Sequence, residues 1–340
     1  MGLFSFTQKL AIDLGTANTV IIHDGKIVID QPSYVTMNKK TDKVEWVGME
    51  AYRRFEKENN DLETIRPLRD GVVADLVASE HMIRGLIRMA NPKKRLFPLS
   101  LKVVVCVPSG STDVEIRAVR DSAEKAGANE VFLIHEPMAA ALGIGLDVME
   151  PTGNMIVDIG GGTTEIAVIS LGGIVSNKSI KVAGDEFTSD IVDHMKQEHG
   201  VRVGERTAEE IKKHVGSALM DLEEDAPADF EVIGQDMVSI LPKAVAVNYK
   251  EIATCLDKSI AKIETAVGNA LDNTLPELYA DIVKNGVYLA GGGALLKGLA
   301  KRLSDKFALP FIVAEDPLHV VAKGTYIALE NTSKYTLLFK

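Results

Sequence analysis

One stretch of the sequence decides the fold: Ile12-Asp13-Leu14-Gly15-Thr16-Ala17-Asn18-Thr19, which returns in altered form as Val157-Asp158-Ile159-Gly160-Gly161-Gly162-Thr163-Thr164. In each copy an apolar strand reaches an Asp, a tight turn of small residues follows, and a second apolar strand begins. These second strands cover residues 20–23 and 166–170. Two copies of one strand–turn–strand unit predict a duplicated fold.

The small residues of both turns suit anionic ligands. Backbone N–H groups can reach phosphate oxygens where no bulky side chain intervenes. Asp13 and Asp158, at the two strand ends, add carboxylates that can hold a divalent cation, through water when the cation is Mg²⁺. One turn alone is also compatible with a plain hairpin, because short glycine motifs are weak evidence. The pair predicts phosphate and metal bound together.

Composition sets the broad class. A length of 340 residues suits two domains, and 46% hydrophobic against 5% aromatic residues predicts an aliphatic α/β core. The formal net charge of −10 argues against nucleic acid as a partner and against a general affinity for anionic lipid. Any contact with a membrane is therefore expected to be local.

The cysteines and the apolar runs bear on location. Cys106 lies in an apolar strand and Cys255 in a helical region, so they form no metal-binding pattern and predict buried thiols in a reducing compartment. No apolar run has the length that spans a bilayer, and residues 1–10 lack the charged start and cleavage site of a secretory signal. We expect a cytoplasmic protein.

The first half of the chain reads as strands with an insertion. Residues 9–13, 19–23 and 26–30 predict a meander, in which Asp24-Gly25 supplies a tight hairpin turn. Residues from about 31 to 66 break this rhythm and predict a small inserted subdomain.

A helix and a strand-to-helix corner follow. Thr112 and Glu115 have the spacing of a capping box, and Gly127 closes the predicted helix. The strand at residues 131–134 then runs into Glu136-Pro137, where proline suits a first helical position. Glu136 is therefore held at a strand-to-helix corner.

The second half contains further helix signals. Thr207 with Glu210 predicts a capped helix start, and the acidic helix from residue 207 to 225 is interpreted as a solvated face rather than a docking site. A polar stretch near residues 222–236 belongs to a second inserted subdomain. Residues 286–290 predict a strand that leads through three glycines into a helix at 294–307, and a late helix covers 320–329.

Taken together, these motifs resemble the nucleotide site of the actin, heat-shock chaperone and sugar kinase superfamily, and most closely the MreB family of bacterial actins. The segments that carry the resemblance span nearly the whole chain: 13–19, 66–72, 107–110, 136–141, 158–165, 210–212 and 291–296.

The resemblance implies an α/β, actin-like duplicated ATPase fold of two domains, each with a core sheet flanked by helices and a small inserted subdomain. Domain I would comprise residues 1–145 plus 320–340, with its insertion at about 31–66. Domain II would comprise residues 146–319, with its insertion at about 184–245.

The resemblance also implies that ATP binds between the domains, with Mg²⁺ oriented through its waters by Asp13 and Asp158. The residues implied to hold the nucleotide are Gly15, Thr16, Ala17, Asn18, Gly160, Gly161, Gly162, Thr163, Glu209, Glu210, Ile211, Lys212, Gly291, Gly292, Gly293, Ala294 and Leu295.

Hydrolysis needs a water placed in line with the γ-phosphorus, so positioning supplies most of the catalysis. Glu136 is the candidate that orients this water, Thr163 is the candidate that contacts the water or the γ-phosphate, and Asp158 holds the metal. The alternative for Glu136 is a carboxylate stabilised by a helix N-terminus, worth about 0.3–1 kcal/mol.

Two positions depart from the family pattern: His135, where an acid is common, and Ala290, where Thr is common.

Two apolar segments predict a membrane contact, as in the family. Leu3, Phe4 and Phe6 lie at the N-terminus, and Leu96-Phe97 follows three cations at residues 93–95. Each cation gains about 1 kcal/mol near anionic headgroups, and apolar side chains gain by leaving water. The alternative is that both segments pack against the protein core.

The resemblance further implies head-to-tail protofilaments, paired antiparallel on the inner membrane, that organise cell-wall elongation through membrane proteins such as RodZ and MreC. A sugar or acid kinase is the weaker alternative, since no additional Asp motif serves a hydroxyl acceptor. A full heat-shock chaperone is not expected, because no peptide-binding domain follows the last core helix. A plasmid- or chromosome-segregating actin would use the same nucleotide chemistry without the apolar segments.

Overall fold

The computed structural model describes residues 7–57, 59–90 and 100–339. The predictions for Leu3, Phe4, Phe6, Leu96 and Phe97 lie outside these described residues. Within the described ranges, no helix combines the length and apolar character of a membrane-spanning segment.

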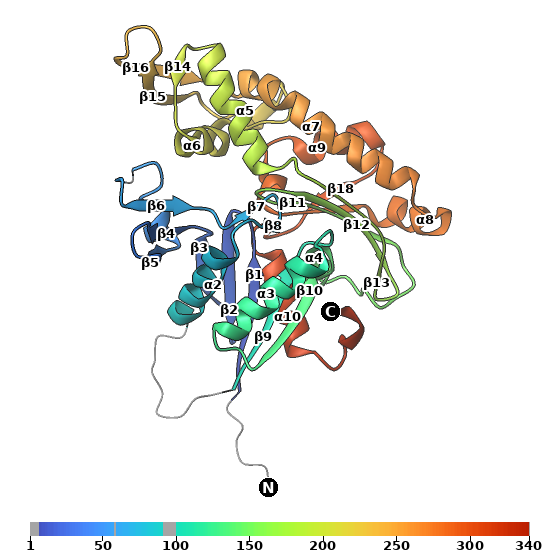
Figure 1. The fold of residues 1–340 in the computed structure, drawn as a ribbon. Coiled ribbons are helices and arrows are strands. Elements are labelled where there is room, and N and C mark those ends of the chain that lie inside the picture. Colours follow the sequence, from blue (N-terminus) through green and yellow to red (C-terminus); the bar gives the residue numbers. More distant parts are fainter. Residues whose placement is uncertain (1–6, 58, 91–99, 340) are drawn as a thin grey trace.

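The first half of the chain builds a five-stranded sheet with the order β10-β9-β1-β2-β3 (Figure 1). Its strands are β1 (Thr7–Leu14), β2 (Asn18–His23), β3 (Lys26–Pro32), β9 (Ser100–Val107) and β10 (Glu130–His135). β1, β2 and β3 form the expected antiparallel meander, while β9 runs parallel to β1 and β10 parallel to β9. Asp24 and Gly25 have φ values of 48° and 72°, as a two-residue hairpin turn requires.

The second half builds a sheet of the same plan, with the order β13-β12-β11-β17-β18. Its strands are β11 (Asn154–Ile159), β12 (Thr164–Ser170), β13 (Gly173–Ile180), β17 (Val287–Ala290) and β18 (Phe311–Val313). Again an antiparallel meander is followed by two parallel strands on the side of its first strand. The two sheets match strand for strand, so the duplication predicted from the paired turns is confirmed.

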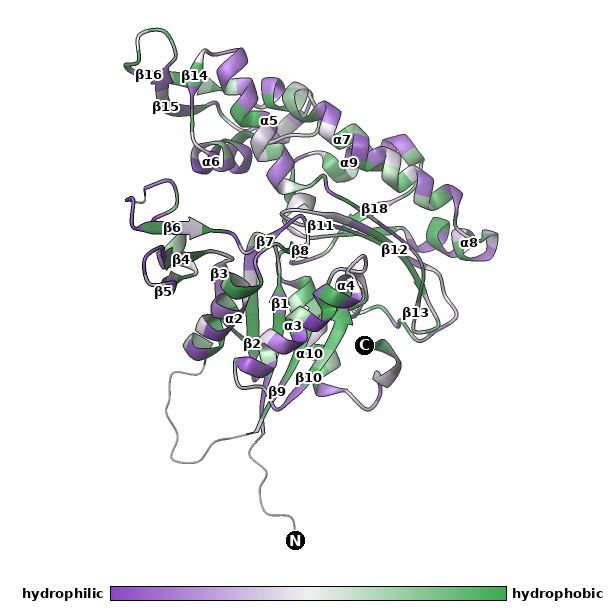
Figure 2. Cartoon of the chain, viewed as in Figure 1, coloured by the Kyte–Doolittle hydropathy of each residue, from purple (hydrophilic) through white to green (hydrophobic). Residues whose placement is uncertain are grey.

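Helices cover both sheets with their apolar sides, and polar residues face outward (Figure 2). Those of the first sheet are α2 (Leu76–Ala90), α3 (Asp113–Lys125), α4 (Glu136–Ile144) and α10 (Val320–Glu330). Those of the second half are α5 (Gly184–Gln197), α6 (Glu205–Val215), α7 (Tyr249–Asp272), α8 (Pro276–Asn285) and α9 (Leu299–Phe307).

The side chains of β1 alternate between two cores. Leu10 and Ile12 pack with α2 and α3 on one face of the sheet. Ala11 packs on the other face with α4 and α10, in a core that also includes Ile156 and Ile169 of the second sheet. The pair α4–α10 therefore lies between the two halves and connects them.

The backbones of α4 and α10 touch where they cross. A side chain on Gly143 would overlap with the carbonyl group of Val320, and one on Gly324 would overlap with the carbonyl group of Ala139. Glycine is needed at both positions because any Cβ would separate the helices.

Two small sheets are inserted, and both lie on the same side of the molecule in Figure 1. The first contains β4 (Val35–Asn38), β5 (Lys43–Val47) and β6 (Leu62–Ile65), with the short helix α1 (Met49–Tyr52) and the nearby pair β7 (Leu68–Arg69) and β8 (Val72–Val73). The second contains β14 (Val201–Arg202), β15 (Phe230–Asp236) and β16 (Pro242–Val247).

The helix starts test the capping predictions. Thr112 and Glu115 form the predicted capping box of α3. The prediction that Thr207 caps the next helix is wrong: α6 begins at Glu205, after Gly204, without a side-chain cap. The buried residues Ala208 and Ile211 set the register of this helix, so Thr207 lies within its first turn.

The acidic segment 207–225 is not one helix. α6 ends at Val215 because Gly216 is extended, with φ −62° and ψ 129°, and a separate 3₁₀ turn covers Glu223–Asp225. A side chain at Gly216 would overlap with the carbonyl oxygen of Lys212. Gly216 N–H still donates the last helical hydrogen bond, to the Lys212 carbonyl at 2.9 Å, and the extended backbone of Gly216 then leads the chain away.

The predicted helix at 294–307 is also divided. A 3₁₀ turn covers Gly292–Leu295, Leu296 is extended, and α9 starts only at Leu299. Gly298 adopts a left-handed conformation with φ 74°, which no continuous helix contains. Similarly, Pro137 occupies the second helical position of α4 rather than the first.

Candidate functional site

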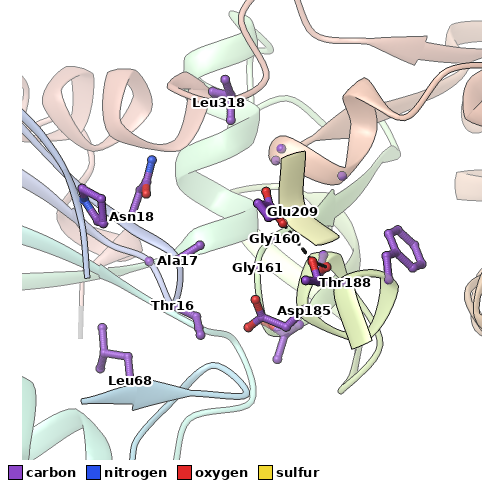
Figure 3. Close-up of a pocket in the computed structure, with 18 of the residues that line it drawn as sticks. Thr16, Ala17, Asn18, Leu68, Gly160, Gly161, Asp185, Thr188, Glu209 and Leu318 are labelled. Carbon is purple, nitrogen blue, oxygen red and sulfur yellow. Dashed lines mark hydrogen bonds between the residues drawn. The ribbon is translucent and has the colours of Figure 1, made fainter. Parts of the chain in front are cut away.

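A cavity of about 740 Å³ lies between the two halves, lined by both repeated turns. The predicted site residues that line it are Asp13, Gly15, Thr16, Ala17, Asn18, Glu136, Asp158, Gly160, Gly161, Thr163, Glu209, Lys212, Gly291, Gly292, Gly293 and Leu295. Figure 3 shows the two turns facing each other, with Thr16, Ala17 and Asn18 opposite Gly160 and Gly161. The structure therefore brings together most of the residues proposed from the sequence.

The two turns meet at close range. A side chain on Gly161 would lie 2.6 Å from the Ala17 Cβ, so glycine is required there by the opposing turn. The backbone N–H of Gly71 donates a hydrogen bond of 3.2 Å to Thr16 Oγ1. Small residues in both turns thus let two backbones close over one ligand.

Buried carboxylates gather at the base of the cavity. Burial raises the pKa of Asp13 to about 6, although a hydrogen bond of 3.1 Å from Cys106 Sγ and the charge of His319 act against the rise. Burial and the charges of Asp13 and Glu165 raise the pKa of Asp158 to about 8. Burial and the neighbouring acids likewise raise the pKa of Glu136 well above its usual range.

This cluster fits a hard divalent cation. Burial and neighbouring acids all raise the pKa values of Asp158 and Glu136. A positive charge between these groups would offset both the cost of burying their ionised forms and the repulsion between them. Carboxylate oxygens are the ligands that Mg²⁺ prefers. Asp13 on β1 and Asp158 on β11 line the cavity from one half each, in keeping with the metal role proposed for them.

Glu165 was not given a role from the sequence, yet it joins the two halves behind Glu136. Its Oε2 atom accepts hydrogen bonds from the backbone N–H of Ser109 (2.9 Å) and from Ser109 Oγ (2.8 Å). Ser109 follows β9 of the first sheet, and Glu165 lies on β12 of the second. No local pattern indicates this contact, because the partners lie 56 residues apart.

One wall of the cavity is formed by α5 and α6. Lys212 Nζ lies 2.6 Å from Glu209 Oε2 and donates to the Gly184 carbonyl at 2.8 Å. Thr188 Oγ1 donates to Glu209 at 2.8 Å, shown as the dashed line in Figure 3. Burial opposes ionisation of Glu209, but Lys212 and Thr188 outweigh it and lower the pKa of Glu209. Glu209 is therefore held ionised and oriented beside Lys212 at the cavity surface.

The opposite wall is aromatic and was missed in the sequence. Tyr34 packs edge-on against Tyr52 and Phe55, with ring centroids 5.2 and 5.1 Å apart. Arg206 of α6 lies over the Tyr52 ring at 5.6 Å, which brings the two inserted subdomains together. Widely spaced aromatic residues in an irregular segment carry no periodic signal, so their convergence could not be predicted.

An ion pair also crosses the cavity mouth. Arg66 Nη2 lies 2.7 Å from Asp185 Oδ2, and it donates to the Thr16 carbonyl at 3.3 Å. Arg66 precedes β7, and Asp185 is in the first turn of α5. The pair fastens the turn at residues 15–18 to the second half of the chain.

Four proposed nucleotide residues lie outside the cavity lining: Gly162, Glu210, Ile211 and Ala294. Ile211 is fully buried in the core of the second half, and Ala294 is 3% exposed. Gly162 packs against the backbone of Asp70. These three support the wall from behind.

Comparisons with known proteins agree over nearly the full chain. The family model described as MreB/Mbl protein matches residues 7–337. The chain is 44% identical to the cell shape-determining protein Mbl of Bacillus subtilis (strain 168), over 97% of this chain and 98% of that protein. It is also 44% identical to the cell shape-determining protein MreB of Escherichia coli (strain K12), over 96% of this chain and 94% of that protein.

Solved structures agree as well. Crystal structures of MreB5 of Spiroplasma citri, bound to AMPPNP and to ADP, superpose with TM-scores of 0.89 and 0.90 at 36% identity. They cover 97% and 98% of this chain, and 98% and 99% of their own chains. The actin-like fold expected from the sequence is therefore confirmed, and the chain belongs to the MreB/Mbl family of cell shape-determining, actin-like proteins.

Proposed function

We propose that this protein binds ATP with Mg²⁺ in the cavity between its halves, hydrolyses it, and uses the nucleotide state to control filament assembly. The observation that carries the proposal is the pair of small-residue turns that face each other over a buried carboxylate cluster. The relatives from S. citri were solved with AMPPNP and ADP, which supports an adenine nucleotide as the ligand.

In this proposal each wall has a separate task. The turns at 15–18 and 160–163 enclose the phosphates, while Glu209 and Lys212 on α6 lie toward the ribose and adenine. The glycines at 291–293 leave backbone surface for the nucleoside. Asp13 and Asp158 would hold Mg²⁺ through water, and the bound ion would supply positive charge to the phosphate oxygens.

Glu136 and Thr163 are the proposed catalytic residues. Glu136 lies at the first position of α4, on the cavity lining and behind the metal carboxylates. From the cavity lining it would position the attacking water by hydrogen bonding. Thr163 follows the second turn, where its hydroxyl can contact the water or the γ-phosphate.

We assign domain I to residues 1–145 plus 320–340 and domain II to 146–319. The packing of α10 on α4, β1 and β9 supports the return of the chain to its first half. The contact of α4 and α10 with both sheets supports a hinge at this place.

Self-association is supported by apolar residues at two ends of the second half. The β15–β16 tip exposes Val238 (93%), Ile240 (67%) and Leu241 (64%). At the other end, Leu275, directly before α8, is 59% exposed, and Ile312 of β18 is 41% exposed. In Figure 1 the tip lies at the upper left and α8 at the right, so one patch of each chain can meet the other patch of the next. Such a heterologous contact propagates as a filament.

The finer cellular role is proposed from the family. Antiparallel paired protofilaments would lie on the inner face of the cytoplasmic membrane, bind lipid through Leu3, Phe4, Phe6, Leu96 and Phe97, and direct peptidoglycan elongation through RodZ and MreC. We expect the double substitution Leu96→Ser with Phe97→Ser to abolish co-sedimentation with anionic liposomes; full retention would show that this loop is no anchor.

Two measurements test the proposal as a whole. Calorimetry on the folded protein should detect one ATP site that requires Mg²⁺ for full affinity. Electron microscopy with ATP on lipid monolayers should show membrane-bound paired filaments, whereas free filaments would favour a segregation actin and absence of polymer would favour a kinase. Absence of any adenine nucleotide binding would overturn the proposal.

A further inference from the structure

Three side chains that the proposed nucleotide chemistry does not use converge at the C-terminal end of α5. His194 lies in the last turn of α5, His199 in the connection to β14, and Glu251 in the first turn of α7. Glu251 Oε2 lies 3.2 Å from His194 Nε2 and 2.7 Å from His199 Nε2. One ligand atom from each residue lies within 4.8 Å of the other two.

The cluster is sheltered but accessible. The side chains of His194, His199 and Glu251 are 13%, 22% and 20% exposed. The two imidazole rings do not stack: they meet edge to face, with an interplanar angle of 72° and centroids 5.6 Å apart. The Nε2 atom of each ring contacts the same carboxylate oxygen, Glu251 Oε2. All three side chains therefore keep partial access to solvent.

We infer that His194, His199 and Glu251 form a site for a transition-metal ion, best filled by Zn²⁺, with water as the fourth ligand. Two imidazoles, one carboxylate and one open position are a recurrent zinc donor set, and the four residues between the histidines fall within the spacing of zinc motifs.

The distances suit this ion. Tetrahedral Zn²⁺ with bonds of about 2.0–2.2 Å places its ligand atoms about 3.3–3.5 Å apart. The Glu251–His194 distance of 3.2 Å lies within about 0.1 Å of this range, and the Glu251–His199 distance of 2.7 Å reaches it after a shift of about 0.6 Å. His199 is in a connecting segment rather than within a helix, so this shift is local.

The surroundings hold the ligands in place. Glu251 Oε1 accepts hydrogen bonds from Asn248 N (2.6 Å) and Asn248 Nδ2 (3.0 Å), which leaves Oε2 for the histidines. Lys243 Nζ donates to the His199 carbonyl at 2.8 Å, so its charge is directed to the backbone and to Asp236. Such outer contacts orient metal ligands and are part of most metal sites.

An ion here would join three segments: α5, the α5–β14 connection and α7. The other end of α5 presents Gly184 and Asp185 to the nucleotide cavity. Metal binding would therefore stiffen a wall of that cavity from a point outside it. This inference does not depend on nucleotide hydrolysis.

The test is titration of chelator-treated full-length protein with Zn²⁺, followed by calorimetry. We expect one equivalent that His194→Gln, His199→Gln and Glu251→Gln each weaken by at least about tenfold. Glu251→Gln is the sharpest variant, because a glutamine oxygen can still accept from Asn248 and maintain the helix cap while the second ligand oxygen is lost. His81→Gln on α2 is the matched control and should bind Zn²⁺ as the wild type does.

A second variant separates this site from the carboxylates of the nucleotide cavity, where Asp13, Cys106 and Glu136 also lie within 4.8 Å of one another. The Zn²⁺ equivalent should survive Asp13→Asn, and Co²⁺ in its place should give a tetrahedral spectrum without a thiolate charge-transfer band. Zn²⁺ should also raise the melting temperature of the wild type but not of Glu251→Gln. Unchanged binding in Glu251→Gln and His199→Gln, loss in Asp13→Asn, or a thiolate band would each overturn the inference.

Discussion

At the scale of single residues, the most informative group is the carboxyl of Glu136. It is buried next to Glu165, Asp13 and Asp158, and each of these acids raises its pKa. Such crowding destabilises an unliganded protein and is typical of functional sites. A helix N-terminus alone would favour the ionised form, which is the opposite effect.

Glu136→Ala should leave ATP affinity nearly unchanged and slow phosphate release in a single turnover by at least about a hundredfold, because positioning of the attacking water is lost. Glu136→Gln, which retains a hydrogen-bonding group, should lose less. Glu130→Ala, at the exposed start of β10, is the control. An unchanged single-turnover rate in Glu136→Ala would refute the catalytic assignment.

The raised pKa of Asp158 predicts a pH-dependent stability. The folded state retains a proton on Asp158 up to about pH 8, whereas the unfolded chain releases it near its ordinary value of 3.8. The native state therefore binds more protons between these values, and the free energy of unfolding falls as the pH rises from 4 to 8. Urea unfolding of protein free of nucleotide and metal should show this slope.

Asp158→Asn should reduce that slope, since the variant has no proton to release at this position, while Asp13 and Glu136, whose pKa values are also raised, still contribute to it. Asp121→Asn on α3 should retain the wild-type slope. Equal slopes for Asp158→Asn and the wild type would show that Asp158 is ionised in the folded protein.

Sequence patterns located Asp13, Asp158 and Glu136 because each ends a strand or starts a helix. They could not assign Cys106 as a hydrogen-bond donor to Asp13, or Ser109 as the donor to Glu165. The first contact depends on β1 and β9, parallel neighbours that are distant in the sequence, and the second joins the end of β9 in the first sheet to β12 in the second sheet.

At the scale of elements, the sequence predicted strands and their turns better than it predicted where helices begin. The two meanders and their turns agree with the prediction, since alternation and Asp24-Gly25 are local signals. The starts of α6 and α9 were wrong because tertiary contacts at Gly204 and Gly298 determine them. Gly204 faces Glu56 of the other inserted subdomain, a neighbour that no local pattern could indicate.

The β15–β16 tip carries the prediction at this scale. Val238→Ser combined with Leu241→Ser should raise the critical concentration for sedimentation at least about tenfold, because two exposed apolar side chains no longer gain by burial between subunits. ATP affinity should not change. Val175→Ser, on the edge strand β13 and 46% exposed, is the matched control. Assembly at the wild-type concentration would exclude the tip from the contact.

At the scale of the whole molecule, two duplicated halves share one helix pair. α4 begins with the proposed catalytic Glu136, and α10 returns from the end of the chain to cross it. The core around them contains residues of both sheets. A change in how α4 and α10 cross would therefore alter both the cavity and the relative orientation of the two halves. Composition predicted the two-domain class and the aliphatic core. It could not predict the contact between α4 and α10, because a glycine in each of two helices is compatible with many ways of packing them.

Gly324→Ala tests the helix crossing. Alanine is favoured over glycine in a helix by about 0.5–1 kcal/mol, yet here its methyl group would overlap with the Ala139 carbonyl. Overpacking of about 1–3 kcal/mol should exceed the helical gain and lower the free energy of urea unfolding. Because α4 must move, ATP turnover should fall as well.

Gly268→Ala on α7 is the matched control, because its methyl group would meet only the Phe307 ring at an ordinary distance of 3.4 Å. This variant should be as stable as the wild type or more stable, with unchanged turnover. Both variants replace a helical glycine by alanine, but Gly324→Ala is expected to lower the free energy of unfolding and Gly268→Ala to leave it unchanged or raise it. The difference between them isolates the backbone contact between α4 and α10. If Gly324→Ala stabilised the protein as Gly268→Ala does, the helices would not cross in contact, and a hinge between the halves would have to lie elsewhere.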